Sequence, residues 1–148
     1  MATFDTVIDI NAPPGRVLAV LMDVERWPEW TSTVTSIKRL DAGPFDVGSK
    51  AMIKQPKLMP AVWGVTELDK HRNFTWAMRS PGLKVEAGHV VNPRGEGSRV
   101  TLSLNFSGFL APVMSRFYAN LNRRYLATEA KGLKERCETQ QSCAGTSA

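Results

Sequence analysis

Two reactive side chains are expected to point into the interior of the protein. They are His89 and Tyr125. His89 alternates with Val85, Ala87 and Val91, so it should lie on the apolar face of a strand. The unperturbed pKa of histidine lies near neutral pH, so His89 could act as a general base in an aldol-type cyclisation or assist a dehydration. Tyr125 could supply a hydroxyl group to the same reaction from the facing helix.

A structural role is the alternative for both residues. His89 could be a polar core residue that hydrogen-bonds a neighbour or orients a ligand, and Tyr125 could pack in the core with its hydroxyl at the rim. No second catalytic group follows from the sequence. It has no glycine-rich phosphate loop, no nucleophile elbow and no histidine pair at metal spacing, so we expect no metal and no nucleotide cofactor.

A set of apolar residues shares the inward face with His89. Any single one is ordinary core, but together they could line a void: Trp63, Trp76, Met78, Val85, Leu104, Phe106, Met114, Phe117 and Leu121. A ligand that buried ten methylene groups there would gain about 8 kcal/mol before ordering costs are subtracted. The apolar loop residues Leu58, Met59 and Pro60 are candidates for the mouth of such a cavity.

The elements that would position these residues follow one another through short connections. A strand is expected first and two short helices next, the second ending at the Trp27–Trp30 segment, whose two tryptophans should tie the helices to the sheet. Period-two patterns then predict six strands in an antiparallel meander. The ranges are Phe4–Ile10 for the first strand, Pro14–Met22 for the first helix, and Thr33–Leu40, Ser49–Gln55, Ala61–Leu68, Asn73–Ser80, Leu83–Val91 and Ser98–Gly108 for the meander.

The longest predicted element is a helix from Ala111 to about Cys137, opened by Pro112 in its first turn. A helix of about 26 residues spans roughly 40 Å, so it needs an extended surface to lie on. We therefore predict an α+β fold, a helix-grip arrangement in which a curved seven-stranded antiparallel sheet surrounds the C-terminal helix. Space between sheet and helix is a ligand site by default. Residues 1–138 should form a single domain and residues 139–148 a flexible tail.

Composition excludes several classes of protein. The chain has 148 residues, and no run of 18 apolar residues exists to make it an integral membrane protein. We see no secretion signal, and the two cysteines, Cys137 and Cys143, offer neither a disulfide framework nor metal spacing, so the cytoplasm is the expected location. The net charge is +5. Six basic residues lie on the final helix with Glu129, Glu135 and Glu138 among them, which favours a solvated outer face over a nucleic-acid partner.

Several local strings, together with the order of elements, resemble the SRPBCC superfamily, also called START-like or Bet v 1-like, and within it the polyketide cyclase/dehydrase group. The resemblance covers about residues 3–137 and implies a helix-grip fold whose cavity binds lipids, sterols, polyketides or hormones, with only some members acting as enzymes. It brings no shared catalytic motif. The strings are Ile10-Asn11-Ala12-Pro13-Pro14, Asp23 followed by Trp27-Pro28-Glu29-Trp30, Val47-Gly48-Ser49, Trp63 through Glu67, Phe74-Thr75-Trp76, and Gly97-Ser98-Arg99-Val100-Thr101-Leu102.

Three functions follow as hypotheses. The first is binding of a small hydrophobic molecule, polyketide-like or lipid-like, between the sheet and the long helix. The second is a cofactor-independent cyclase or dehydratase that uses His89 with Tyr125 or bound water. The third is a non-catalytic scaffold whose cavity is filled by its own side chains. A homodimer is one open oligomeric state.

Overall fold

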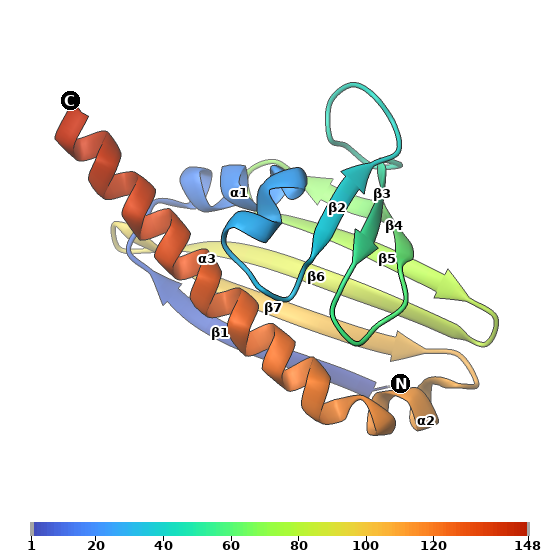
Figure 1. The fold of residues 1–148 in the computed structure, drawn as a ribbon. Helices are drawn as coiled ribbons and strands as arrows, with labels where there is room; N and C mark the ends of the chain where they lie inside the picture. The colour runs from blue at the N-terminus through green and yellow to red at the C-terminus, as the bar shows by residue number, and fades with distance from the viewer. Residues whose placement is uncertain (1, 148) are drawn as a thin grey trace.

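A curved antiparallel sheet of seven strands dominates the computed structural model, which describes the backbone of residues 2–147 and the side chains of residues 3–139 (Figure 1). The strand order is β1-β7-β6-β5-β4-β3-β2, so the chain forms a meander from β2 to β7 and β1 completes the sheet beside β7. The strands are β1 Ala2–Ile10, β2 Ser36–Arg39, β3 Lys50–Lys54, β4 Ala61–Asp69, β5 Asn73–Ser80, β6 Leu83–Arg94 and β7 Gly97–Ser107.

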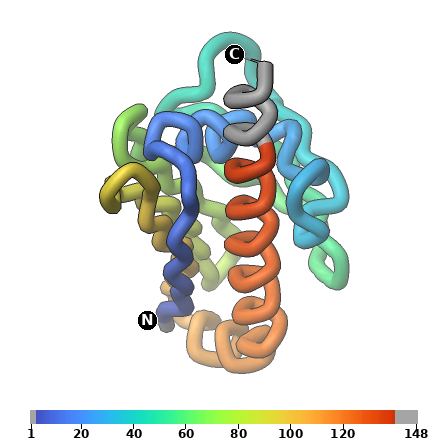
Figure 2. Tube along the Cα trace, turned by 90° about the vertical axis from the view of Figure 1, so that its left-hand side faces the viewer, coloured from blue at the N-terminus to red at the C-terminus, as the bar shows by residue number. Residues whose placement is uncertain are grey.

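The helices lie at the ends and across one face of this sheet. Helix α1 (Pro14–Met22) and the 3₁₀ helix η1 (Val24–Glu29) connect β1 to β2, while α2 (Ala111–Phe117) and α3 (Ala119–Ser147) follow β7. Helix α3 crosses the sheet diagonally, and α2 lies near the start of β1 (Figures 1 and 2). The predicted α+β helix-grip fold is confirmed. Within residues 2–147, no helix has the length and apolar content to cross a lipid bilayer.

The core lies where α3 and the short helices pack on the sheet. Strand alternation places Val85 and Val91 of β6, and Val100, Leu102 and Phe106 of β7, in the buried interior, as period two requires. Helix α3 contributes Leu126, Ala130, Leu133 and Cys137, which recur at helical spacing and are at most 5% exposed.

Two predicted boundaries differ from the structure. The predicted single helix from Ala111 is wrong because the chain breaks at Tyr118, whose φ of −100° and ψ of 13° separate α2 from α3. Helix α3 also continues to Ser147 rather than ending near Cys137. The side chains of residues 140–148 lie outside the described part of the chain, and the flexible tail stays a prediction.

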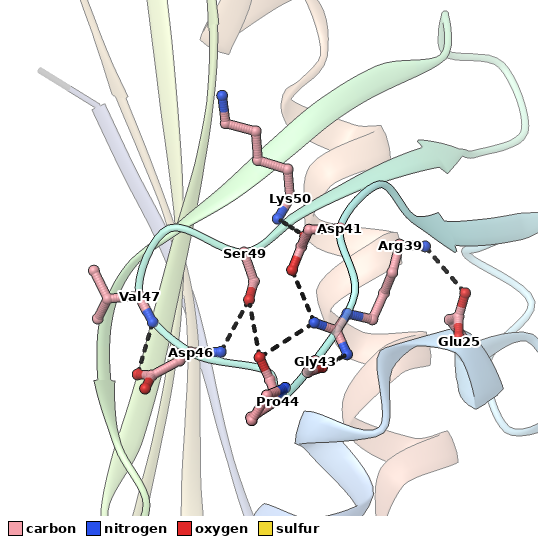
Figure 3. Close-up of polar contacts among 9 residues, drawn as sticks. All are labelled: Glu25, Arg39, Asp41, Gly43, Pro44, Asp46, Val47, Ser49 and Lys50. Atoms are coloured by element: carbon pink, nitrogen blue, oxygen red, sulfur yellow. Dashed lines mark hydrogen bonds and ion pairs between the residues drawn. The ribbon is translucent and has the colours of Figure 1, made fainter.

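The long loop between β2 and β3 is held by its own polar contacts (Figure 3). The guanidinium of Arg39 donates hydrogen bonds to the Gly43 carbonyl at 2.8 Å and to the Asp41 carboxylate at 3.0 Å. The Asp41 carboxylate also accepts a hydrogen bond from the Lys50 backbone N–H at 2.7 Å. This network positions Phe45, whose ring packs edge-on against Phe74 at 5.5 Å, so the loop closes one end of the core.

Candidate functional site

A cavity of about 640 Å³ lies between the sheet and the helices α2 and α3. Its walls come from β4 to β7, from η1, from the loop between β3 and β4, and from one side of α2 and α3. Of the residues that the sequence places in a ligand site, those that line this cavity are Trp63, Trp76, Met78, Val85, His89, Leu104, Phe106, Met114 and Tyr125.

Two predicted lining residues, Phe117 and Leu121, do not line the cavity. Phe117 is 78% exposed. The prediction assumed one straight helix, in which both residues share a sector with Met114. Phe117 precedes the break at Tyr118 and lies one turn after exposed Val113, on the outer side of α2. The break separates Leu121 from the helical wheel of α2, and the residues of α3 that face the cavity are Asn122, Tyr125, Leu126 and Glu129.

His89 is buried at 3% exposure, on the central strand β6 opposite Phe74 of β5. The two rings stack with their centroids 4.2 Å apart and an interplanar angle of 7°. Nδ1 of His89 lies 3.1 Å from the Phe74 carbonyl oxygen. Because a carbonyl oxygen can only accept a hydrogen bond, Nδ1 must carry the proton, and in neutral His89 the free lone pair is on Nε2.

Glu129 of α3 lies beside Nε2 of His89 and forms an ion pair with it when Nε2 is protonated. Its Oε1 lies 3.6 Å from Nε2 of His89, and its side chain is 14% exposed. The prediction that Glu129 belongs to a solvated outer face is therefore wrong. The signal that could have found it is helical spacing, since Glu129 follows Tyr125 by four residues and Leu126 by three.

Asn122 adds a second polar group to the wall of the cavity. Asn122 is 7% exposed, and its Nδ2 has no hydrogen-bond partner among the described residues. An unsatisfied buried donor costs about 1–3 kcal/mol. Rotation about the soft terminal torsion of this side chain would turn the donor toward the cavity, where a ligand oxygen could accept from it.

The hydroxyl of Tyr125 lies at the mouth of the cavity. The hydroxyl donates a hydrogen bond to the carbonyl of Pro56, in the loop between β3 and β4. Burial raises the pKa of Tyr125, against the opposing charge of Arg124, so the hydroxyl stays protonated at neutral pH. The polar partner of the His89 Nε2 is thus Glu129, and Tyr125 ties the mouth loop to α3.

The mouth itself is apolar. Leu58, Met59 and Pro60, which the sequence places at the mouth, all line the cavity opening, and Met59 is 86% exposed. Methionine is flexible and polarisable, so it can pack against ligands of different shape.

Trp27 closes the opposite side of the site. Its indole N–H donates to the Leu21 carbonyl at 2.9 Å, and its ring lies 5.5 Å from His89 and 5.3 Å from Trp76. Trp27 therefore ties the short helices to the sheet, as the sequence predicts, and it also lines the cavity.

A second hollow, of about 540 Å³, lies on the outer side of α1 and η1. Charged and uncharged residues line it in equal number. Two of its arginines are already paired, Arg26 with Asp23 at 3.3 Å and Arg136 with Glu29 at 2.8 Å. Among residues 3–139, no group of three His, Cys, Asp or Glu side chains is arranged to hold a metal ion. The inner cavity is therefore the candidate site. It is mostly apolar, with a polar end around His89 and Glu129 and further polar side chains on its wall, namely Gln55, Arg79, Ser80 and Ser103.

Solved structures share this architecture. The chain superposes on a protein of Thermus thermophilus with a TM-score of 0.75 at 20% identity, covering 94% of this chain and 99% of the other. For Ara h 8.0201 the TM-score is 0.71 at 15% identity, with 93% and 98% covered. For the di-domain ARO/CYC BexL from the BE-7585A biosynthetic pathway it is 0.70 at 16% identity, covering 93% of this chain and 47% of that one. Comparison with curated protein sequences gives no significant match.

The fold and the cavity define a helix-grip protein with an internal site between sheet and C-terminal helix. Within that class, the chain belongs to the family described as polyketide cyclase / dehydrase and lipid transport, whose model matches residues 1–138. This membership agrees with the resemblance that the local sequence strings indicate.

Proposed function

We propose that this protein binds a small hydrophobic molecule, polyketide-like or lipid-like, in the cavity between the sheet and α3. The observation that carries the proposal is the cavity of about 640 Å³ with a mostly apolar lining. That volume lies within the range of about 300–1,000 Å³ typical of small-molecule sites. A scaffold filled by its own side chains would leave less space, so the third hypothesis is disfavoured.

The polar end of the cavity suggests what the ligand carries. The Glu129 carboxylate and the Nε2 of His89 lie 3.6 Å apart; they form an ion pair when His89 is protonated, and both accept hydrogen bonds when it is neutral. A ligand hydroxyl or phenol could donate to either one, and the Asn122 amide could donate to a ligand carbonyl. We therefore propose an apolar molecule with at least one hydroxyl group.

Fluorescence titration with N-phenyl-naphthylamine, an apolar fluorophore, tests the binding function. Ala87 lines the cavity from β6, between Trp76 of β5 and Leu104 of β7. Ala87→Trp should fill part of the void and weaken probe binding by roughly tenfold or more. The matched control is Val7→Trp, which adds the same ring at a position 56% exposed on β1.

Native mass spectrometry of the protein purified from cells provides an independent measurement. An apolar molecule that copurifies with the wild type and is absent from Ala87→Trp would support the proposal. Protein that is consistently empty, and a probe that binds both variants equally, would refute it.

A cyclase or dehydratase activity is a second candidate, favoured by the placement of the His89 Nε2 beside Glu129. In such a reaction Nε2 takes a proton from a carbon next to a ketone, the enolate carbon attacks a second carbonyl, and the imidazolium returns the proton to the alkoxide to give a β-hydroxyketone. Nε2 then removes a second proton from the same α-carbon, a C=C bond forms as the C–O bond breaks, and the imidazolium protonates the departing hydroxide to give water. An acyclic diketone that closes to methylcyclohexenone gives an absorbance assay. If His89→Gln left turnover within a few-fold of the wild type, the catalytic role would be abandoned.

The cytoplasmic location, the homodimer and the absence of a nucleic-acid partner stay predictions. A concentration series by light scattering would test the oligomeric state.

A further inference from the structure

Helix α2 carries apolar side chains on two opposite faces. Ala111, Met114 and Tyr118 point inward, and the last two line the cavity. Phe109, just before the helix, and Val113 and Phe117 within it recur every four residues, and they are 81%, 65% and 78% exposed. Scattered exposed apolar residues are normal, but a helix that is apolar on both faces is expected to be covered on both.

The chain segment that carries this outer face has charge of one sign. Between residues 100 and 128 the only charged side chains are Arg116, Arg123 and Arg124, and all three are exposed. The guanidinium of Arg123 lies 5.5 Å from the centre of the Phe4 ring on β1, so the basic groups border the same end of the molecule.

The neighbouring strand ends add charges of both signs, with one more basic than acidic side chain. The backbone N–H of Leu110 donates to the Gly82 carbonyl in the β5–β6 turn at 2.8 Å, which places that turn beside α2. The adjoining strand ends add Arg79 and Lys84, and Lys84 lies 3.3 Å from Glu86. The outer face of α2 is therefore an apolar stripe with a basic border. Helix α2 lies at one end of the fold (Figure 2).

We propose that the outer face of α2 docks the protein on the surface of an anionic lipid bilayer. Phe109, Val113 and Phe117 would insert below the head groups, and Arg116, Arg123 and Arg124 would contact lipid phosphates and carboxylates. Interfacial helices of this kind bury an apolar face about 5–10 Å deep and gain further from anionic lipid.

Charge favours a lipid surface over a second copy of this chain. A two-fold symmetric contact through α2 would bring the three arginines of one copy close to the same three of the other, and like charges across an interface are costly. Anionic head groups complement the same arginines. Because Met114 and Tyr118 line the cavity from the other side of α2, docking would place one end of the cavity against the membrane.

Vesicle co-sedimentation of the full chain tests this proposal. The protein should bind phosphatidylcholine vesicles that contain about 30% phosphatidylserine, bind pure phosphatidylcholine much less, and lose binding as salt rises. Val113→Ser with Phe117→Ser should lower partitioning roughly tenfold or more, since one buried phenylalanine side chain can supply that factor. Arg116→Gln with Arg123→Gln should reduce the preference for anionic vesicles and leave the apolar stripe intact.

The matched control is Val47→Ser, at a position 58% exposed in the β2–β3 loop. It should bind vesicles as the wild type does, and thermal melts of all variants check that each is folded. The proposal is overturned if the wild type ignores anionic vesicles, or if Val47→Ser weakens binding as much as the α2 variants do. A concentration-dependent dimer that the Val113 and Phe117 changes dissociate would overturn it in favour of self-association.

Discussion

Gly132→Ala should destabilise this protein, although the same substitution stabilises most helices. In the interior of a helix, alanine is favoured over glycine by about 1 kcal/mol. Gly132 lies in α3, and a Cβ placed there would overlap the carbonyl oxygen of Trp30 at the end of η1. The obstacle is backbone, so it cannot be relieved by turning a flexible side chain.

The expected magnitude follows from these opposing effects. Overpacking costs about 1–3 kcal/mol, and an overlap with a backbone carbonyl belongs at the upper end of that range, about 2–3 kcal/mol. Subtracting the propensity gain of about 1 kcal/mol leaves a net loss of about 1–2 kcal/mol. For a chain of this size, each kcal/mol shifts the Tm by about 2–4 °C, so the Tm should fall by roughly 2–8 °C. Thermal unfolding followed by circular dichroism measures this directly.

Gly15→Ala provides the matched control. Gly15 lies in α1, its backbone has no positive φ, and a Cβ there meets no atom within 4 Å. It should raise the Tm by a few degrees through propensity alone. If Gly132→Ala raised the Tm as Gly15→Ala does, α3 could not lie against Trp30, and the wall that α3 gives the cavity would be misplaced as well.

Three further predictions concern single side chains. In a Cys143→Ser background, Cys137 should resist iodoacetamide until the protein unfolds, because burial raises the pKa of its thiol to about 12. The hydrogen bond from the Lys50 backbone N–H is the main cause that lowers the pKa of Asp41. The contacts of the Asp41 carboxylate should therefore stabilise the protein fully above about pH 5, and this stabilisation should be lost as the pH falls through the folded-state pKa. The difference in urea midpoint between the wild type and Asp41→Asn should vanish in the same pH range. Tyr125→Phe should speed probe release about two- to tenfold in stopped-flow fluorescence, because it removes one hydrogen bond to the mouth loop; an unchanged rate would exclude that role.

The fold could be predicted because the strands carry a regular alternation of apolar and polar residues. On β7, buried Val100, Leu102 and Phe106 alternate with Thr101 and Ser103, a pattern that only a half-buried strand satisfies. The same parity rule placed His89 on the inner face of β6, and the structure agrees, with the ring 3% exposed. Local patterns determine these positions, so no tertiary information is needed.

The helical wall of the cavity could not be predicted from periodicity alone. A single helical wheel from Ala111 assigns one sector to Met114, Phe117 and Leu121. Phe117 is already exposed within α2, and the break at Tyr118 invalidates the assignment of Leu121. The residues around Tyr118 include neither proline nor glycine, the usual causes of a helix break. The sequence therefore gives no local signal of this break.

Glu129 was missed for a related reason. Charged residues are almost never fully buried without a partner, so a glutamate among lysines and arginines is assigned to solvent. Its partner, His89, is 40 residues away in sequence and becomes its neighbour only through the packing of α3 on β6. A polar pair formed across two elements is a tertiary feature, and a one-dimensional pattern does not contain it.

Helix α2 connects the two proposals physically. Phe117 precedes the break at Tyr118 and follows exposed Val113 by one turn, so both side chains share the outer side of α2. Met114 of the same seven-residue helix and Tyr118 at its C-terminal end line the cavity. Docking of the outer face of α2 on a membrane should therefore also displace the two cavity-lining residues, Met114 and Tyr118. If both proposals hold, vesicle binding should change the release rate of a bound probe.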